Sequence, residues 1–563
     1  MAAALAGLLV VGCSIDPSVV TLSAEPADGD AVPGAAPPTE VGTDDPAAPT
    51  SEPEPPASPP TAVPPTTVPP ATPPTTVPPT TVPPPTVPPP TVPPTTVPPT
   101  TVPPLVEPLI LSDVALETVA DLGGDKPVRT HDRLAAAALA DIDRWWSEVF
   151  PDVYGEPFVP LQGAVYVGYP ERATDIPGCA EPRTEYEDLQ LFVAFYCQVG
   201  DFIAYDDGPD APSILTGLAD SFGPAVIGVV LAHEYAHAVQ ERIGALDRRL
   251  ATIVTEQQAD CFAGAWTGQA YRGDSPVLRF GDLDVRAGLL AMIEVRDPVG
   301  TNQFEAGGHG SAFDRVGAFQ VGFDEGPSRC AGLLDEPLPL MPNEFQTLGD
   351  LERGGNASYD CADDPNPDCE PAPSFLAEDL DHFWRTTLGE RFDPVTPVPV
   401  DDLATACDDA VVLTIHVVVC PTARTVVFDE PVVRDLYEEG FGDFSIGYVY
   451  GIGWAEFAQR SLGSALTGEQ RLLLSDCYTG AWMRDITPDP TGRTPRGGVD
   501  RDGDGTPDGV TTSPGDLDEA IQMAILVGDE GARVDVVGSA FEKIGAFRVG
   551  VLGGLGACAA VAS

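Results

Sequence analysis

Two histidines and a glutamate stand at a spacing that suits a metal ion. His233, Glu234 and His237 fit the pattern H-E-x-x-H inside the apolar segment 221–243. On a helix, residues four apart lie on one face, so both imidazoles would point at the same metal. Glu234 would lie beside them, where its carboxylate can take a proton from the attacking water. The pattern predicts metal-assisted hydrolysis and leaves the third metal ligand open.

A glutamate that follows His237 by 19 residues is the expected third ligand. Glu256 opens a second predicted helix, and Asp260 lies on the same face of it. Two histidines and one glutamate leave the fourth position of zinc for water, which is the catalytic rather than the structural arrangement. Asp260 is expected to accept a hydrogen bond from a ligand histidine and so fix its tautomer. The alternative is a buried helix that carries these residues incidentally.

Several separated motifs make this region similar to a family of bacterial neutral zinc metallopeptidases. They are HEYAHAVQ at 233–240, EQQADCFAGAW at 256–266, HGSAFDRV at 309–316, and Phe195-Tyr-Cys197 followed by Tyr205-Asp206. The resemblance covers about residues 140–330. It implies a zincin-like fold and peptide-bond hydrolysis, with Glu234 as the base and zinc on His233, His237 and Glu256. The identity of the substrate does not follow from it.

The globular part of the chain reads as two related copies, about 109–335 and 370–560. Four motifs recur in the same order: 256–266 as 472–482, 313–322 as 541–550, 139–146 as 376–384, and Cys197 with 203–206 as Cys420 with 426–429. Chance similarity does not account for four ordered matches. We therefore expect an α+β fold in which a zincin-like module occurs twice.

The second copy lacks every residue that the chemistry needs. The alignment places Ile452, Gly453, Glu456 and Leu472 opposite His233, Glu234, His237 and Glu256. We expect this copy to be degenerate, so that the chain holds one Zn²⁺. Gln240 persists as Gln459, which is typical of a packing residue. Asp260 keeps its counterpart Asp476, so its role is at least partly structural.

His309 is a second catalytic candidate. The ungapped match puts Val537 at its position, although Gly-Ser-Ala-Phe follows in both copies. A histidine lost together with the metal ligands is a candidate to stabilise the oxyanion of the transition state. The alternative is a histidine that only packs a loop. Tyr205, which corresponds to Phe428, is a further candidate on the same grounds.

The cysteines follow the duplication. Of eleven, Cys13 is set aside and ten remain, an even number that suggests disulfides in an exported chain. Each copy supplies four at equivalent places, and the connector supplies two more. The predicted pairs are Cys179–Cys197, Cys261–Cys330, Cys361–Cys369, Cys407–Cys420 and Cys477–Cys558. The alternative is a set of free buried thiols.

The N-terminal stretch resembles a targeting signal followed by a spacer. Residues 1–12 are apolar and Cys13 follows, which resembles the lipobox of bacterial lipoproteins. Twelve apolar residues are too few for a permanent bilayer span, and the alternative is a free cysteine in a tail. The segment 14–108 is rich in proline and threonine, so we expect a disordered stalk near polyproline II. These features predict an extracytoplasmic protein of the cell envelope, lipid-anchored at Cys13 or secreted.

The charge of the chain limits its partners. It has 86 Asp and Glu against 29 Lys and Arg, a formal net charge of -57. Such a balance argues against nucleic-acid binding and against electrostatic docking on anionic lipid. The expected partners are therefore a protein or peptide substrate, and a membrane reached through the lipid anchor.

An acidic loop in the second copy resembles a calcium-binding loop. Side chains with oxygen atoms stand at positions 1, 3, 5, 7 and 9 of this loop: Asp500, Asp502, Asp504, Thr506 and Asp508. Glycine stands at position 6, as in a calcium-binding loop. Thr511 stands at position 12 in place of the bidentate glutamate of an EF-hand, and Asp516 or Asp518 would complete the shell. The alternative to Ca²⁺ binding is a solvated acidic loop.

These inferences define five regions: 1–13 signal segment, 14–108 linker, 109–335 zinc metallopeptidase domain, 336–369 connector, and 370–560 degenerate copy. The expected function is that of an exported, membrane-anchored zinc peptidase that hydrolyses peptide bonds with an activated water. The alternative is a non-catalytic surface protein that binds partners through a peptidase-like scaffold. An intact ligand set beside a lost one favours the enzyme.

Overall fold

The computed structural model describes residues 108–179, 181–209, 213–345, 348–362, 369–401, 403, 406–487, 510–527 and 539–562. The predicted lipidation site Cys13, the stalk up to residue 107 and the acidic loop 500–508 lie outside the described residues. Within the described ranges, no helix combines the length and the apolar character that a bilayer crossing requires.

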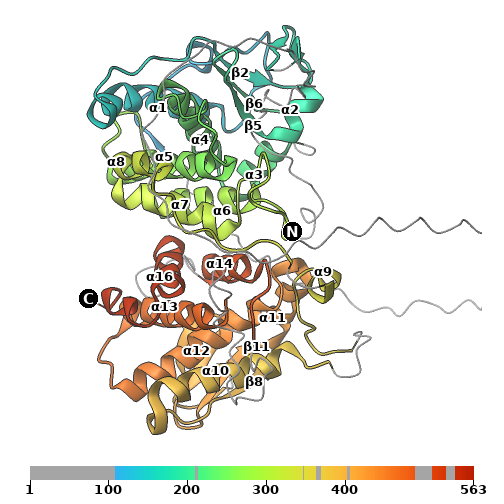
Figure 1. Ribbon diagram of the computed structural model, residues 1–563, viewed down its shortest axis with the longest axis vertical. Helices are drawn as coiled ribbons and strands as arrows, with labels where there is room; N and C mark the ends of the chain where they lie inside the picture. The colour runs from blue at the N-terminus through green and yellow to red at the C-terminus, as the bar shows by residue number, and fades with distance from the viewer. Residues whose placement is uncertain are drawn as a thin grey trace, which may run out of the picture. The chain divides into compact units, whose positions relative to one another are not determined.

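The first half packs helices against a small three-stranded sheet (Figure 1). The helices are α1 (Asp132–Tyr154), α2 (Tyr186–Phe192), α3 (Ile214–Phe222), α4 (Ala225–Arg242), α5 (Thr252–Arg272), α6 (Asp282–Glu294), α7 (Ala312–Glu325) and α8 (Pro327–Ala331). The sheet has the order β2 (Val165–Gly168), β6 (Phe202–Asp206), β5 (Ala194–Cys197). Two short ribbons add β1 (Leu109–Ile110) with β7 (Leu278–Arg279), and β3 (Ile176–Pro177) with β4 (Arg183–Thr184).

The second half has a similar order of elements. After α9 (Leu348–Arg353), its helices are α10 (Ala372–Leu388), α11 (Glu430–Leu436), α12 (Phe444–Leu462), α13 (Gly468–Ile486), α14 (Asp516–Val527) and α16 (Ala540–Gly553). The sheet order is β8 (Thr396–Val400), β11 (Thr425–Asp429), β10 (Val417–Cys420), β9 (Val411–Thr414). The two sheets share a pairing pattern. β6 pairs parallel with β2 and antiparallel with β5, and β11 pairs parallel with β8 and antiparallel with β10. The predicted α+β class is confirmed.

Equivalent side chains make the same buried hydrogen bond in each half. The indole of Trp266 donates to Asp141 at 3.0 Å, and the indole of Trp482 donates to Asp379 at 2.7 Å. These bonds tie α5 to α1 and α13 to α10. Because buried polar groups need partners, each tryptophan fixes how its two helices dock. The repeated bond supports the two-copy interpretation of the sequence.

Glycines let the central helices of each half approach backbone to backbone. A Cβ on Gly264 in α5 would lie 1.9 Å from the carbonyl oxygen of Phe319 in α7. A Cβ on Gly480 in α13 would lie 2.0 Å from the carbonyl oxygen of Phe547 in α16. Neither position tolerates a side chain without separating the helices. The glycines shared by the two sequence motifs are therefore packing residues.

All five predicted disulfides are present. Their Cα–Cα distances lie between 5.5 and 6.1 Å. Cys261–Cys330 joins α5 to α8, and Cys477–Cys558 joins α13 to the turn that follows α16. The hypothesis that equivalent cysteines pair within each copy is confirmed.

The two halves meet through α7 and α16, which exchange reciprocal hydrogen bonds. The amide of Gln320 in α7 donates to the carbonyl oxygen of Phe541, at 2.8 Å. The guanidinium of Arg548 in α16 donates to the carbonyl oxygen of Phe313. Phe313 corresponds to Phe541 in the ungapped match, and Gln320 corresponds to Arg548. The contact therefore follows an approximate two-fold relation between the copies.

Two further glycines lie under these side chains, and the first of them is needed to make room for Arg548. A Cβ on Gly317 would lie 1.8 Å from the guanidinium of Arg548, and a Cβ on Gly545 would lie 3.5 Å from the amide of Gln320. Gly317 and Gly545 are themselves equivalent positions. Each long polar side chain thus lies over a glycine of the opposite helix.

Candidate metal centre

Helix α4 runs through the interior of the first half and carries the H-E-x-x-H residues. Every residue from Ala225 to Gln240 is buried, because α1, α3, α5, α6 and β5 all contact this helix. Pro224 precedes its first turn, and Gly244 with φ of 66° follows its end. A helix that is apolar on all sides belongs in a core, so polar residues within it need buried partners.

Three side chains from α4 and α5 present metal-ligand atoms to one another. The Nε2 atoms of His233 and His237 lie 3.2 Å apart. The carboxylate of Glu256 places one oxygen 3.1 Å from the Nε2 of His233 and the other 3.5 Å from the Nε2 of His237. Ligands about 2.0–2.1 Å from a tetrahedral zinc ion are about 3.3 Å from each other. The separations between the three residues are therefore close to those that a zinc ion requires.

The outer nitrogen of each ligand histidine has an acceptor. The Nδ1 of His233 lies 2.8 Å from Oδ1 of Asp260, and the Nδ1 of His237 lies 2.9 Å from Oε1 of Gln240. The amide of Gln240 donates to the carbonyl oxygen of Thr255 at 2.7 Å, which fixes its oxygen toward His237. Both neutral imidazoles then carry their proton on Nδ1. With the proton on Nδ1, the two Nε2 atoms face each other and are the atoms available to a metal ion.

Arg315 of α7 holds Asp260 in place. Its guanidinium donates to the two carboxylate oxygens at 2.9 and 2.7 Å, and all of these atoms are buried. Burial alone would raise the pKa of Asp260, but Arg315 and His233 outweigh it and hold the pKa below its usual range. Asp260 therefore stays ionised and can hold His233 by a charge-assisted hydrogen bond. The prediction that it orients a ligand and also serves the structure agrees with these contacts.

Glu234 lies in the interior with both carboxylate oxygens lacking a hydrogen-bond partner among the described residues. Its side chain is 0% exposed. Burial raises its pKa, while His233 and His237 act in the opposite direction. Buried carboxylates are normally hydrogen-bonded, so one without a partner indicates a group that serves a ligand.

His309 lies on the loop that leads into α7, within electrostatic range of Glu234 and Glu256. It is 4% exposed, and its charge acts on both Glu234 and Glu256. Asp297 accepts from the backbone amides of His309 and Gly310, at 2.9 and 2.8 Å. The Nδ1 of His309 lies 3.4 Å from the same carboxylate. The structure therefore brings His309 to the predicted centre, and its role in stabilising an oxyanion stays a prediction.

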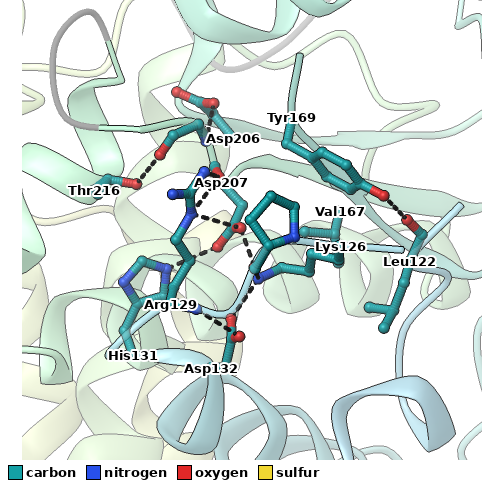
Figure 2. Close-up of polar contacts among 12 residues, drawn as sticks. Leu122, Lys126, Arg129, His131, Asp132, Val167, Tyr169, Asp206, Asp207 and Thr216 are labelled. Atoms are coloured by element: carbon teal, nitrogen blue, oxygen red, sulfur yellow. Dashed lines mark hydrogen bonds and ion pairs between the residues drawn. The ribbon is translucent and has the colours of Figure 1, made fainter. Parts of the chain in front are cut away.

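Tyr205 belongs to a different polar group. It is buried, its hydroxyl has no hydrogen-bond partner among the described residues, and the charges acting on it are those of Asp207 and Asp132. Figure 2 shows the network around these two carboxylates. The ammonium of Lys126 lies 2.5 Å from Asp132 and 2.8 Å from Asp207, and His131 lies 2.7 Å from Asp207. Because the lysine already occupies the space between the carboxylates, this group has no need of a metal ion.

The second half fills the corresponding place with an ion-pair network. Glu456, which takes the position of His237, is fully buried. Its carboxylate accepts from Arg460 at 2.5 Å and from Arg471 at 2.6 Å. Ile452 and Leu472 occupy two of the other ligand positions and are buried. Within the described residues of this half, the place equivalent to the metal centre therefore holds a neutralised carboxylate.

Sequence reasoning missed three residues that support the centre. Gln240 was expected to be a packing residue, yet it also holds His237, and its spacing of three residues on the same helix face signals this. Arg315 and Asp297 approach from distant segments, and no local spacing indicates them.

Asp518, a candidate to complete the calcium shell, instead accepts from the first amides of α7 and lies 3.4 Å from Arg296.

Comparisons with known proteins give relatives without an assigned role. Proteins of Mycobacterium bovis and Mycobacterium tuberculosis, each called an uncharacterized protein, are 34% identical to the chain over 157 residues. The match covers 24% of this chain and 53% of each relative, so the chain spans about half the length of the curated relatives it matches. No family model and no solved structure matches the chain. The resemblance to zinc metallopeptidases stays a prediction from the motifs.

Proposed function

We propose that the protein is a zinc-dependent hydrolase that cleaves peptide bonds, with its catalytic centre in the first half. The observation that carries this proposal is the triangle formed by His233, His237 and Glu256. The separations between their Nε2 and carboxylate oxygen atoms include values of 3.1, 3.2 and 3.5 Å. The neighbouring carboxylate of Glu234 is buried and has no hydrogen-bond partner among the described residues. Two histidines and one glutamate are the ligand set of a catalytic zinc site. The motifs similar to zinc metallopeptidases support a peptide substrate.

The side chains around the ligands divide the work. When bound, zinc polarises the scissile carbonyl and makes a water molecule more acidic. Glu234 takes the proton of the attacking water on its carboxylate and delivers it to the leaving amine. Asp260 and Gln240 hold the ligand imidazoles with their Nε2 atoms directed inward. His309 is suited to donate a hydrogen bond to the developing oxyanion.

The five disulfides support the proposal that the protein works outside the cytoplasm, because structural disulfides persist in oxidising compartments. We propose the cell envelope as its location. Lipid attachment at Cys13 and calcium binding at residues 500–508 stay predictions.

The test combines metal analysis with a peptide-library digest of the full chain. We expect one zinc per wild-type chain and cleavage of a subset of peptides. Glu234→Gln should keep the zinc and lower turnover about 10²–10⁴-fold, because it removes the base and leaves the ligands. Glu256→Gln should lose zinc as well as activity. Glu456→Gln, the matched change in the second half, should alter neither.

Three results would contradict this assignment. Undiminished turnover of Glu234→Gln would show that another group is the base. Two zinc ions per chain, or none after reconstitution, would refute a single centre in the first half. A zinc-loaded wild-type protein that cleaves no peptide would instead favour the non-catalytic binding protein.

A further inference from the structure

A second group of buried carboxylates lies in the other half of the chain. Asp443 precedes the first turn of α12, and Asp516 and Glu519 belong to the first turn of α14. Their exposed fractions are 5%, 2% and 8%. One carboxylate oxygen from each lies within 4.8 Å of the corresponding oxygens of the other two. Three negative groups thus meet in the interior at the start of two packed helices.

Asp443 has one oxygen left over for a ligand. Its Oδ2 accepts from the backbone amide of Ala357 at 2.9 Å. Its Oδ1 is buried and accepts no hydrogen bond from any described residue. A carboxylate oxygen without a partner in the interior is strongly unfavourable unless a cation or a proton meets it.

Further oxygens converge on the same place. The amide oxygen of Asn356 accepts from the backbone amide of Asp443 at 2.9 Å, and a carboxylate oxygen of Glu519 accepts from that of Phe444 at 2.9 Å. A Cβ on Gly442 would lie 2.1 Å from both Asn356 Oδ1 and Glu519 Oε1. Gly442 also has a φ of 61°, so glycine is required on both grounds. The backbone is thereby shaped to admit these oxygens.

The chain neutralises other buried carboxylates with its own cations. Lys126 lies between Asp132 and Asp207, and two arginines meet Glu456. Among the described residues, Asp443 and Glu519 form no direct ion pair with a lysine or arginine, and the charges of Arg353 and Arg296 act on them only from farther away. Burial raises the pKa of Asp443 to about 7 and raises that of Glu519 as well.

The first half of the chain has different residues at the positions that correspond to Asp443 and Glu519. Its helix α6 begins with the same Gly-Asp-Leu-Asp sequence at 281–284 that precedes and opens α14 at 515–518. The next residue is Val285 there and Glu519 in the second half. The residue before the central helix is Pro224 there and Asp443 in the second half. Two acids therefore stand in the second half where the first half has a proline and a valine.

We propose that Asp443, Asp516 and Glu519 bind a divalent cation of the hard, oxygen-preferring kind, with Ca²⁺ as the ion that fits best. Carboxylates and an amide oxygen are ligands for Ca²⁺, Mg²⁺ and Mn²⁺ rather than for zinc. A largely buried site made by protein oxygens suits Ca²⁺, because Mg²⁺ usually keeps several waters. The ion joins the starts of α12 and α14 to the connector at Asn356. None of these three ligands belongs to the zinc centre.

The experiment uses the zinc-loaded full chain, freed of other metals, with Ca²⁺ as the probe. Titration calorimetry gives the number of sites, and thermal unfolding gives the stabilisation. We expect millimolar Ca²⁺ to raise the melting temperature by at least about 3 °C, as mass action predicts for a ligand of the folded state. Asp443→Asn combined with Glu519→Gln should abolish the shift.

Matched variants separate this site from the loop. Asp502→Asn with Asp504→Asn should leave the shift in place. Without Ca²⁺, the zinc-loaded Asp443→Asn, Glu519→Gln variant should melt no lower than the zinc-loaded wild type, since it removes buried charges, and this confirms that it folds. Absence of any Ca²⁺-induced shift or binding heat in the wild type would overturn the proposal. So would a shift that survives in the Asp443 and Glu519 variant but disappears in the loop variant.

Discussion

Asp260 and Asp476 occupy equivalent places, and replacing each by asparagine separates a structural role from a metal-orienting one. Asp260 accepts from Arg315 at 2.7 and 2.9 Å and from His233 at 2.8 Å. Asp476 accepts from Lys543 at 2.8 and 3.1 Å, and from Tyr448 at 2.6 Å; Tyr448 lies one helical turn before the position that corresponds to His233. Both carboxylates are fully buried. Both substitutions are therefore expected to lower stability, and only Asp260→Asn is expected to affect a metal ligand.

The shared consequence is a loss of stability. Each variant leaves a buried cation, Arg315 or Lys543, without its anion, which costs about 3–5 kcal/mol of unfolding free energy. Only Asp260→Asn also weakens the orientation of a metal ligand. Loss of such an outer partner typically lowers metal affinity about 10–100-fold, or about 1.4–2.7 kcal/mol. Asp476→Asn should leave zinc affinity within twofold of wild type.

The assay pairs urea unfolding of the metal-free proteins with zinc competition against a chromophoric chelator. A third variant, Asp260→Asn with Arg315→Met, removes both buried charges and should regain much of the stability while retaining the zinc defect. Equal zinc affinities for Asp260→Asn and the wild type would refute the orienting role. An equally large zinc defect in Asp476→Asn would show that the effect is a general loss of structure.

Two further predictions concern stability. Burial raises the pKa of Asp314 to about 7; the negative charge of Asp518 adds to this rise and the positive charge of Arg548 opposes it. The folded state therefore holds this proton more tightly than the unfolded state, so protonated Asp314 stabilises the protein below about pH 4. That stabilisation, on the order of 4 kcal/mol, is lost as the pH rises through 7, and Asp314→Asn should remove this part of the urea-unfolding pH profile. Replacing Cys261 and Cys330 by serine opens a loop of sequence separation 69 and should lower the unfolding free energy by about 4 kcal/mol, whereas the same change at the pair of separation 8, Cys361–Cys369, should lower it by about 2–3 kcal/mol. A flat difference profile for Asp314→Asn, or equal losses for the two disulfides, would contradict these expectations.

The central helices and their ligands could be predicted because the relevant geometry is local. His233 and His237 are one helical turn apart, and so are Glu256 and Asp260, so spacing alone places each pair on one face. The disulfides could be paired because the repeat supplies a second example of each bond. The sequence comparison also located the positions where the second half loses its ligands.

The supports of the centre could not be predicted, because they come from residues far apart in the chain. Arg315 is 55 residues from Asp260, and nothing in the spacing distinguishes it from a surface arginine. The same holds for Asp443 and Glu519, which only the docking of α14 on α12 brings together. Glu456 looked like a simple loss of a histidine, while the structure shows that Arg460 and Arg471 compensate for it.

The reciprocal contact between α7 and α16 resembles the interface of a symmetric dimer. When two identical chains meet about a two-fold axis, every residue acts on both sides of the axis, and a change on one side is imposed on the other. Covalent fusion of the partners removes that constraint. Gln320 and Arg548 illustrate the result, since equivalent positions now carry different side chains and still reach the same carbonyl of the opposite helix. Each half can therefore diverge without its partner: the second half carries a glutamate bound by two arginines at the position where the first half carries His237.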